Sequence, residues 1–386
     1  MKKSKFLKVF SSAMALSVIL AGCSTSNNSS SKNAPKAKVE FKTEVDNGGS
    51  TVDGATLKYG ILSPTPLTGM WNPIFLTQQT DNEVIGNVVG DTFSTDDERK
   101  VKQDNEDDPV KFHLDREKKE ITFTVHKDLK WSDGSEVTAK DIVATYELMG
   151  NPKFKENARY TNAFDLIEGM KDYHEGKADK ISGITEKDNK TVVVKYTEIK
   201  PSVLFGEGWI SNVLNAKQVA DASKDFSKFA EADLNKKPLS FGPYVIKEIV
   251  PGQQVIAEAN PYYAFGKPKT PKMEIKAVPS AQVVAAAKSG EYDIIDSFSS
   301  DLYEKFAALK NGKIASNYYG GYGYISFKLG KWNKEKNEVV TDPNAKMADK
   351  NLRKAMAMAV DRDTVNKKLQ NNLSIPLYQL IPPMFA

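Results

Sequence analysis

The chain has few of the residues that usually carry metal or nucleophilic chemistry. Its 386 residues include one cysteine, Cys23, and three histidines, His113, His126 and His174. One cysteine excludes an intrachain disulfide, and the histidines are too scattered for a His-Glu-x-x-His zinc site. The sequence also lacks a Gly-x-Ser-x-Gly motif and a P-loop. A glycosidase-like carboxylate pair stays open, but we expect no enzymatic activity, no metal and no cofactor.

The chain also lacks an excess of charge once its first residues are set aside. It has 54 basic and 50 acidic residues, and four of the basic ones are Lys2, Lys3, Lys5 and Lys8. The other 50 basic residues balance the 50 acidic residues. We therefore expect no general attraction to nucleic acid or to anionic membranes.

No hydrophobic run is long enough for a stable membrane span. The longest N-terminal run, 10–20, follows the four lysines, and residues 1–22 are typical of a signal peptide. Leu20-Ala21-Gly22-Cys23 resembles a bacterial lipobox, which implies a lipid-modified Cys23. A lipid of this kind anchors a protein durably on the outer side of the cytoplasmic membrane. We expect the protein to be displayed in this way on the surface of a Gram-positive cell. Residues 23–50 are rich in Ser, Asn, Lys and Gly, which predicts a flexible tether.

Beyond the tether, hydrophobic periodicity predicts alternating strands and helices. Residues 56–62 are expected to form a strand, and 82–89 a helix, with the polar residues 77–80 held at the junction. Further predicted strands and hairpins cover 110–114, 181–184, 191–196, 244–247, 272–278 and 290–296. Further predicted helices cover 215–229 and 281–289, and 330–346 is expected to be a polar loop.

The stretch 123–149 carries the most specific signature. Phe123 and Val125 alternate with polar residues, a turn follows at 131–134, and Thr138 precedes Asp141 at capping-box spacing. Trp-Ser-Asp-Gly at 131–134, followed by Val-Thr-Ala-Lys-Asp-Ile-Val at 137–143, resembles the signature of peptide-binding lipoproteins of bacterial ABC importers. Similar motifs at 241–244, 260–263, 290–296 and 349–363 support this resemblance from about Leu57 onward.

This resemblance implies a periplasmic-binding-protein-like α/β fold with two lobes, a hinge and an extra small domain. The first lobe would be discontinuous, comprising 51–91 and 216–319, and the small domain would comprise 92–215. The second lobe would begin at 320. Because family members continue well beyond residue 386, we expect a second lobe that is incomplete in 320–386. We also expect proteolysis to trim the chain to near residue 320, and peptide binding by this chain to be weak or absent.

By resemblance, the protein would capture extracellular oligopeptides and deliver them to the permease and ATPase subunits of an ABC transporter. The expected ligand-contacting residues lie at loops or at the crossover between lobes: Gln78, Gln79, Tyr160, Asp296, Ser297, Tyr318, Tyr319 and Tyr322. The tyrosines between 318 and 324 could instead fill the pleat of a buried strand. Dipeptides, pheromone peptides, nickel chelates and haem remain alternative ligands, and a surface lipoprotein for signalling or adhesion remains an alternative function.

Overall fold

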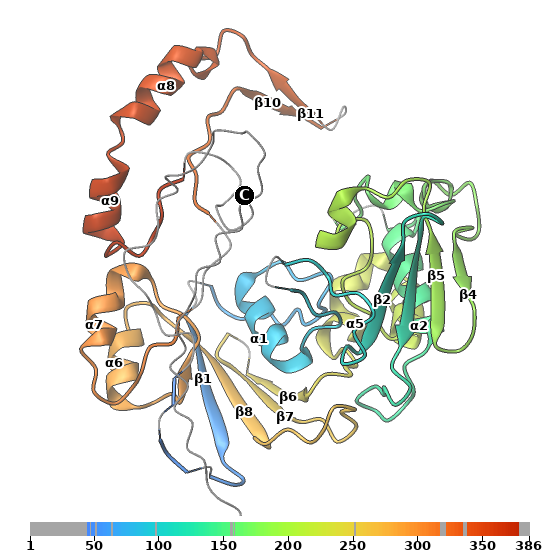
Figure 1. The fold of residues 1–386 in the computed structure, drawn as a ribbon, viewed down its shortest axis with the longest axis horizontal. Coiled ribbons are helices and arrows are strands. Elements are labelled where there is room, and N and C mark those ends of the chain that lie inside the picture. Colours follow the sequence, from blue (N-terminus) through green and yellow to red (C-terminus); the bar gives the residue numbers. More distant parts are fainter. Residues whose placement is uncertain are drawn as a thin grey trace, which may run out of the picture. The chain divides into compact units, whose positions relative to one another are not determined.

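The computed structural model describes residues 45–377 except 47, 51, 63–64, 97–98, 155–156, 158, 251, 317–321 and 335–337 (Figure 1). Within this part, two larger sheets and a separate hairpin account for the named strands. None of the helices described there has the length and apolar character that crossing a bilayer requires.

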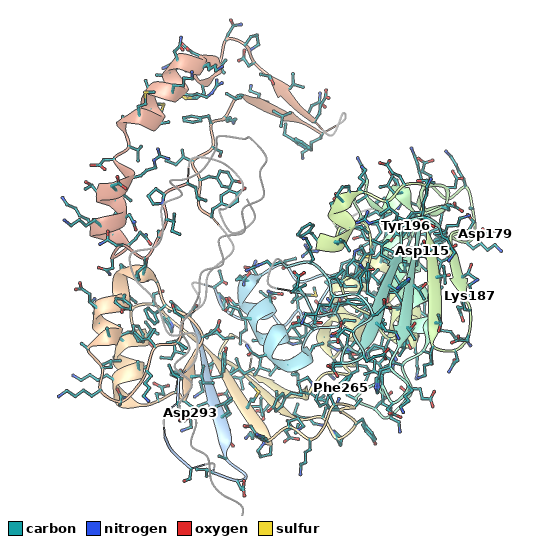
Figure 2. The ribbon with its side chains drawn as sticks, in the orientation of Figure 1. Asp115, Asp179, Lys187, Tyr196, Phe265 and Asp293 are labelled. Atoms are coloured by element: carbon teal, nitrogen blue, oxygen red, sulfur yellow. The ribbon has the colours of Figure 1, made fainter. Side chains whose placement is uncertain are left out.

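A five-stranded sheet places β1 (Thr56–Leu62) between two parallel neighbours. The strand order is β6-β7-β8-β1-β9, and β1 runs parallel to both β8 (Lys272–Val278) and β9 (Ile294–Ile295). β6 (Tyr244–Val250) and β7 (Gln254–Ala259) extend the sheet in antiparallel pairing. Next to β9, the carboxylate of Asp293, labelled in Figure 2, accepts a 2.8 Å hydrogen bond from the Lys58 backbone N–H.

Helix α1 (Gln79–Val89) buries its apolar face on this sheet. Val84, Ile85 and Val88 are at most 4% exposed and belong to one core with Ile61 and Ile275. The predicted helix at this place is therefore confirmed, and it begins three residues earlier than expected. A smaller core holds α6 (Val283–Ser289) and α7 (Tyr303–Ala307) through Val283 and Phe306.

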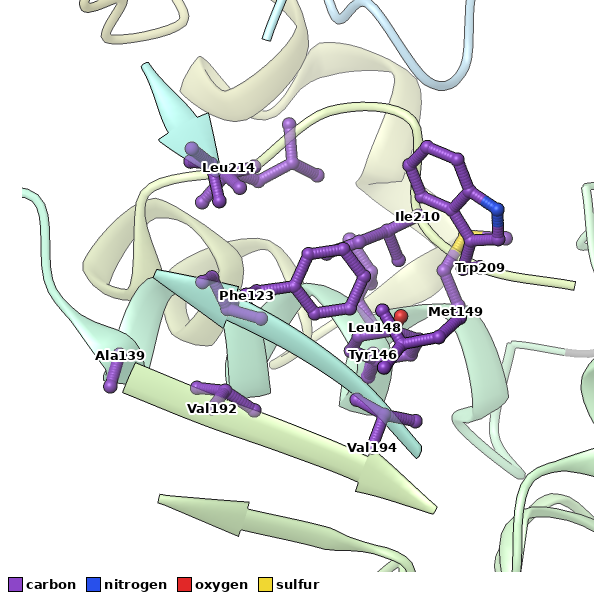
Figure 3. Close-up of a cluster of buried hydrophobic side chains, with 14 of the residues drawn as sticks. Phe123, Ala139, Tyr146, Leu148, Met149, Val192, Val194, Trp209, Ile210 and Leu214 are labelled. Atoms are coloured by element: carbon purple, nitrogen blue, oxygen red, sulfur yellow. The ribbon is translucent and has the colours of Figure 1, made fainter. Parts of the chain in front are cut away.

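The four-stranded sheet is antiparallel throughout, in the order β2-β3-β5-β4. Its strands are Val110–Asp115, Glu120–Val125, Thr191–Lys195 and Ile184–Glu186 in that order. Alternate residues of β2, β3 and β5 are buried, and α2 (Ala139–Gly150) covers that inner face, where the Tyr146 ring lies 6.3 Å from the Phe123 ring between centroids (Figure 3). Period-two alternation on the strands and helical spacing on α2 explain this packing.

The turn and cap before α2 are formed as the sequence predicts. The Asp141 carboxylate accepts the Thr138 backbone N–H at 2.7 Å, and the Thr138 side chain accepts the N–H of Asp141, which completes a capping box. Gly134 has φ +89, and a Cβ there would lie 2.9 Å from the ring of Tyr262. The turn thus requires glycine for its conformation and for the close approach of a ring far along the chain.

Two predicted elements are shorter than expected. The helical pattern at 215–229 divides into α4 (Ala216–Ala222) and a 3₁₀ turn (Phe226–Glu231), because the Asp225 carboxylate accepts the Ser227 N–H and starts a new turn. The strand expected at 290–296 is reduced to the two residues of β9. Helices α3 (Met170–His174) and α5 (Asp233–Lys236) complete this region together with the short 3₁₀ turns Phe164–Leu166 and Pro201–Phe205.

The core beneath the four-stranded sheet continues past residue 215. It includes Val219, Ala222, Phe229 and Leu234, all at most 8% exposed, and the backbone N–H of Ala216 donates to Asp141 at 2.7 Å. The predicted domain boundaries stay predictions, but side chains from both sides of residue 215 share this core.

The prediction of a polar loop over residues 330–346 is wrong for the eight residues that form strands. Residues 330–333 and 338–341 form the antiparallel strands β10 (Gly330–Asn333) and β11 (Glu338–Thr341), in which Trp332 pairs with Val339. These β-formers outweigh the polar composition around them. Helices α8 (Lys350–Ala359) and α9 (Arg362–Leu369) follow, with Asp349 and Asp361 as N-caps. A 3₁₀ turn at Lys346–Ala348 and another at Ser300–Leu302 complete the elements.

Candidate functional site

A hollow of about 670 Å³ lies between the β1–α1 connection and the helix and loops beside the four-stranded sheet. Its first wall comes from the end of the loop before α1 and the first turn of that helix. Its second wall comes from the end of α2 and from two loops further along the chain. The lining residues are Pro73, Ile74, Leu76, Thr77, Gln78, Gln79, Asn82, Met149, Arg159, Thr161, Phe164 and residues 206–211.

The first wall presents amide side chains from a firmly held helix start. Gln78 has the extended backbone of an N-cap residue but makes no side-chain cap hydrogen bond, and Gln79 is exposed. One turn further, the buried Asp81 carboxylate accepts the backbone N–H of Thr68 at 3.0 Å and also the Thr68 hydroxyl. The helix start is thereby tied to the preceding loop, which keeps the two glutamines at the hollow.

Arg159 connects the second wall to the first. Its backbone N–H donates to Asn157 Oδ1 at 3.0 Å, and Asn157 Nδ2 donates to the carbonyl of Met149 at 2.8 Å. Its guanidinium donates through Nη2 to the carbonyl of Leu76 in the opposite wall. Arg159 is therefore carried by a turn anchored on the end of α2.

The loop 206–211 is held rigidly while it exposes a carboxylate. Gly206 and Gly208 both have positive φ, +90 and +81, and flank the exposed Glu207. The buried indole of Trp209 donates through Nε1 to the Val203 carbonyl at 2.7 Å and meets Phe93 edge-on at a centroid distance of 4.9 Å. Figure 3 shows Trp209 beside Met149 and Ile210 in the core. The anchored indole fixes the position of Glu207 and Ser211.

A second group of polar side chains lies beside the five-stranded sheet and comes from β1, α1 and the residue after β9. The Tyr59 hydroxyl donates to Asp296 Oδ1 at 2.8 Å, and burial, reinforced by this carboxylate, raises the pKa of Tyr59. Burial also raises the pKa of Glu83, with a smaller contribution from the negative charge of Asp296. Glu83 Oε2 is buried without a hydrogen-bond partner among the described residues. Asp296 thus links the end of β9 to Tyr59 of β1 and influences Glu83 of α1.

The predicted ligand-contacting residues divide between these places. Gln78 and Gln79 line the hollow, whereas Asp296 and Ser297 are exposed directly after β9. Tyr160 follows Arg159, but its hydroxyl donates to Asp165 at 2.7 Å and its ring stacks on His174 at 3.8 Å.

The remaining predicted site residues lie toward the chain ends. Tyr322 is 41% exposed and Tyr324 is 73% exposed, so these two rings do not fill a buried pleat. Tyr318, Tyr319 and Cys23 lie outside the described residues. Ligand contact at the eight predicted site residues and lipidation of Cys23 stay predictions.

The sequence interpretation missed Arg159 and Glu207. Neither belongs to a motif, and only the two glycines around Glu207 give a local signal of an exposed loop. The hollow therefore combines amides and hydroxyls, one cation, one anion and an apolar floor that includes Leu76, Met149 and Phe164. The described lining contains no histidine and no cysteine. Such a surface suits a ligand with both hydrogen-bond donors and acceptors.

The sequence and the structure of this chain are similar to those of known proteins over most of its length. The chain is 34% identical to the oligopeptide-binding protein OppA of Lactococcus lactis subsp. lactis over 394 aligned residues, which cover 100% of this chain and 64% of that protein. The structure of lactococcal OppA, described as complexed with an endogenous peptide in the closed conformation, matches with a TM-score of 0.73 and 32% identity. This match covers 86% of this chain and 62% of the solved chain.

A more distant structure shares the fold. The oligopeptide-binding protein AppA of Bacillus subtilis matches with a TM-score of 0.63 at 19% identity, over 86% of this chain and 59% of that chain. The predicted periplasmic-binding-protein-like α/β fold is confirmed by these structures. The family model of the bacterial extracellular solute-binding proteins, family 5, matches residues 111–386. The chain therefore belongs to family 5 of the bacterial extracellular solute-binding proteins.

Proposed function

We propose that the protein captures oligopeptides outside the cytoplasmic membrane and delivers them to the permease of an ABC importer that is driven by its ATPase subunits. The observation that carries this proposal is the 34% identity, over the whole chain, to a protein named as oligopeptide-binding. The chain spans 64% of the length of that relative. A structure of a lactococcal relative is described as holding an endogenous peptide, which supports the same ligand class here.

The hollow has the chemistry that such a ligand requires. The amides of Gln78, Gln79 and Asn82 both donate and accept, so they can pair with peptide N–H and C=O groups of any sequence. Hydroxyl groups of Thr161 and Ser211 can hold bridging waters around side chains of different size. In our proposal, hinge closure of the two lobes then encloses the peptide.

We further propose that the protein binds its ligand without transforming it. The described hollow has no histidine or cysteine to activate a nucleophile. Amides and an arginine fork recognise a ligand by hydrogen bonds, and this accords with membership of a solute-binding family.

An N-terminal lipid on Cys23 would keep the protein at the outer face of the membrane beside its permease. The lipobox-like Leu20-Ala21-Gly22-Cys23 supports this placement. We expect Cys23→Ser to move the protein from the membrane fraction into the medium, since no acyl chain can then be attached. A variant that stays in the membrane fraction would contradict the proposed anchor.

The ligand class is tested by identifying what co-purifies with the protein. We expect mass spectrometry of the extracted small molecules to find peptides of several residues. Ligand-observed NMR, which also detects weak binding, should then show saturation transfer to the same synthetic peptides. Exclusive recovery of dipeptides, a nickel chelate or haem would replace the proposed ligand. Absence of binding to any free solute would favour a role in signalling or adhesion.

A further inference from the structure

Two opposite charges face the hollow without an ionic partner in the part of the chain that the structure describes. Arg159 and Glu207 both line it, and no ion pair joins either side chain to a described residue. Charges that are placed in a concave surface but left uncompensated are available to a ligand.

Arg159 is held in place before any ligand arrives. Asn157 supports its backbone, and the Leu76 carbonyl accepts one of its guanidinium N–H groups. A guanidinium has five N–H donors in a planar fork, so further donors remain after this bond. The flexible side chain has therefore already lost part of the freedom that ligand binding would cost it.

The donor set around this guanidinium matches a carboxylate. A planar fork binds the two oxygens of a carboxylate, and neighbouring amides such as Gln78 and Gln79 can donate to the same group. We propose that Arg159 is a specificity-determining residue that binds a carboxylate of the captured peptide. The protein should consequently bind a peptide that carries this carboxylate more tightly than a matched peptide that lacks it. This inference rests on the proposed peptide-binding function.

The test uses three peptides of one length, the unaltered chain and three variants. The reference peptide has a central glutamine and an amidated C-terminus. A second peptide replaces the glutamine by glutamate, and a third restores the free C-terminal carboxylate. Affinities are measured by calorimetry or ligand-observed NMR for the unaltered chain, Arg159→Gln, Arg159→Lys and Glu207→Gln.

We expect the unaltered chain to bind at least one carboxylate peptide about tenfold more tightly than the reference, since charge-assisted hydrogen bonds exceed neutral ones. Which of the two it favours shows whether the carboxylate is a side chain or a C-terminus. Arg159→Gln should abolish the preference without weakening the reference peptide. Arg159→Lys should keep part of it, and Glu207→Gln should keep or increase it. Added salt should reduce it in the unaltered chain.

Three results would overturn the inference. An unaltered chain that binds all three peptides equally well has no such preference to explain. Equal weakening of all peptides by Arg159→Gln would assign the arginine a purely structural role through Leu76. An equal loss of preference in Glu207→Gln would show a general disturbance of the hollow. In each of these cases peptide binding itself survives, so the proposed function would stand.

Discussion

Helices α2 and α8 have similar sequence patterns, but the apolar side chains of α2 are buried and those of α8 are exposed. Each follows an N-cap that binds backbone N–H groups, Thr138 with Asp141 in α2 and Asp349 in α8. Each has apolar residues at helical spacing. In α2, Ile142, Tyr146 and Leu148 are at most 1% exposed.

The apolar residues of α8 are exposed instead. Leu352 is 39% exposed, Met356 is 43% exposed and Met358 is 84% exposed. The difference teaches that caps and periodicity define where a helix lies, while burial depends on a partner surface. For α2 that surface is the four-stranded sheet. No comparable surface covers α8 among the described residues. Two pairs of substitutions test this comparison, and two further tests concern the turn before α2 and helix α1.

The largest difference is expected from removing one apolar side chain in each environment. Phe123→Ala deletes a ring that is 0% exposed against Tyr146 and Trp209, and we expect it to lower the free energy of unfolding by about 3–5 kcal/mol. Met356→Ala in α8 should change it by less than about 1 kcal/mol. Urea denaturation followed by tryptophan fluorescence measures both. Equal losses would mean that α8 is packed as tightly as α2.

The two N-caps give the next largest contrast. Asp141 is 4% exposed and accepts backbone N–H groups from Thr138 and Ala216, both at 2.7 Å. Asp141→Ala leaves two partly buried N–H donors without this acceptor, at a cost of roughly 2–4 kcal/mol. Asp349→Ala removes an exposed cap from α8, at a cost of about 1 kcal/mol or less. Thermal unfolding of the two variants should preserve this order, and a reversed order would contradict it.

A smaller effect is expected at the turn that precedes α2. Gly134→Ala forces a side chain into a conformation with φ +89 and against the Tyr262 ring, and we expect a loss of roughly 1–3 kcal/mol. Gly206→Ala is the matched control, because Gly206 has φ +90 and a Cβ added there would have no neighbour within 4 Å. The Tyr262 contact predicts a larger loss for Gly134→Ala. Equal losses would show that backbone conformation accounts for the whole effect.

The smallest effect concerns α1, whose Glu83 is only half-buried. Burial raises the pKa of Glu83 above its ordinary value, so the folded protein favours the protonated carboxyl. The stabilisation that the protonated Glu83 carboxyl contributes to folding is therefore fully present below about pH 4.5. It is lost as the pH rises through the raised pKa of Glu83. We expect Glu83→Gln to be more stable than the unaltered chain at pH 7 and equally stable below pH 4. A constant difference across this range would exclude the carboxyl as its cause.

Several elements follow from local sequence alone. The apolar pattern has the period of a strand and predicts three strands, Thr56–Leu62, Lys272–Val278 and Thr191–Lys195. The strand predicted at 181–184 instead lies at Ile184–Glu186. The capping box at Thr138 and Asp141 was predictable because it joins residues only three positions apart. The family resemblance could also be recognised from the sequence, because the Trp-Ser-Asp-Gly signature at 131–134 is continuous in the chain.

Only the tertiary structure decided which side chains meet across long sequence separations. The hollow joins Gln78 and Arg159, and Tyr59 binds Asp296, which lies 237 positions away. The hairpin at 330–341 was missed because its polar composition hid the cross-strand pairing of Trp332 with Val339. Helical spacing predicts an apolar side for α8 as well as for α2. The spacing does not predict which other segment packs against that side. The reason is physical: periodicity is a property of one segment, whereas burial and a binding surface are properties of two segments brought together.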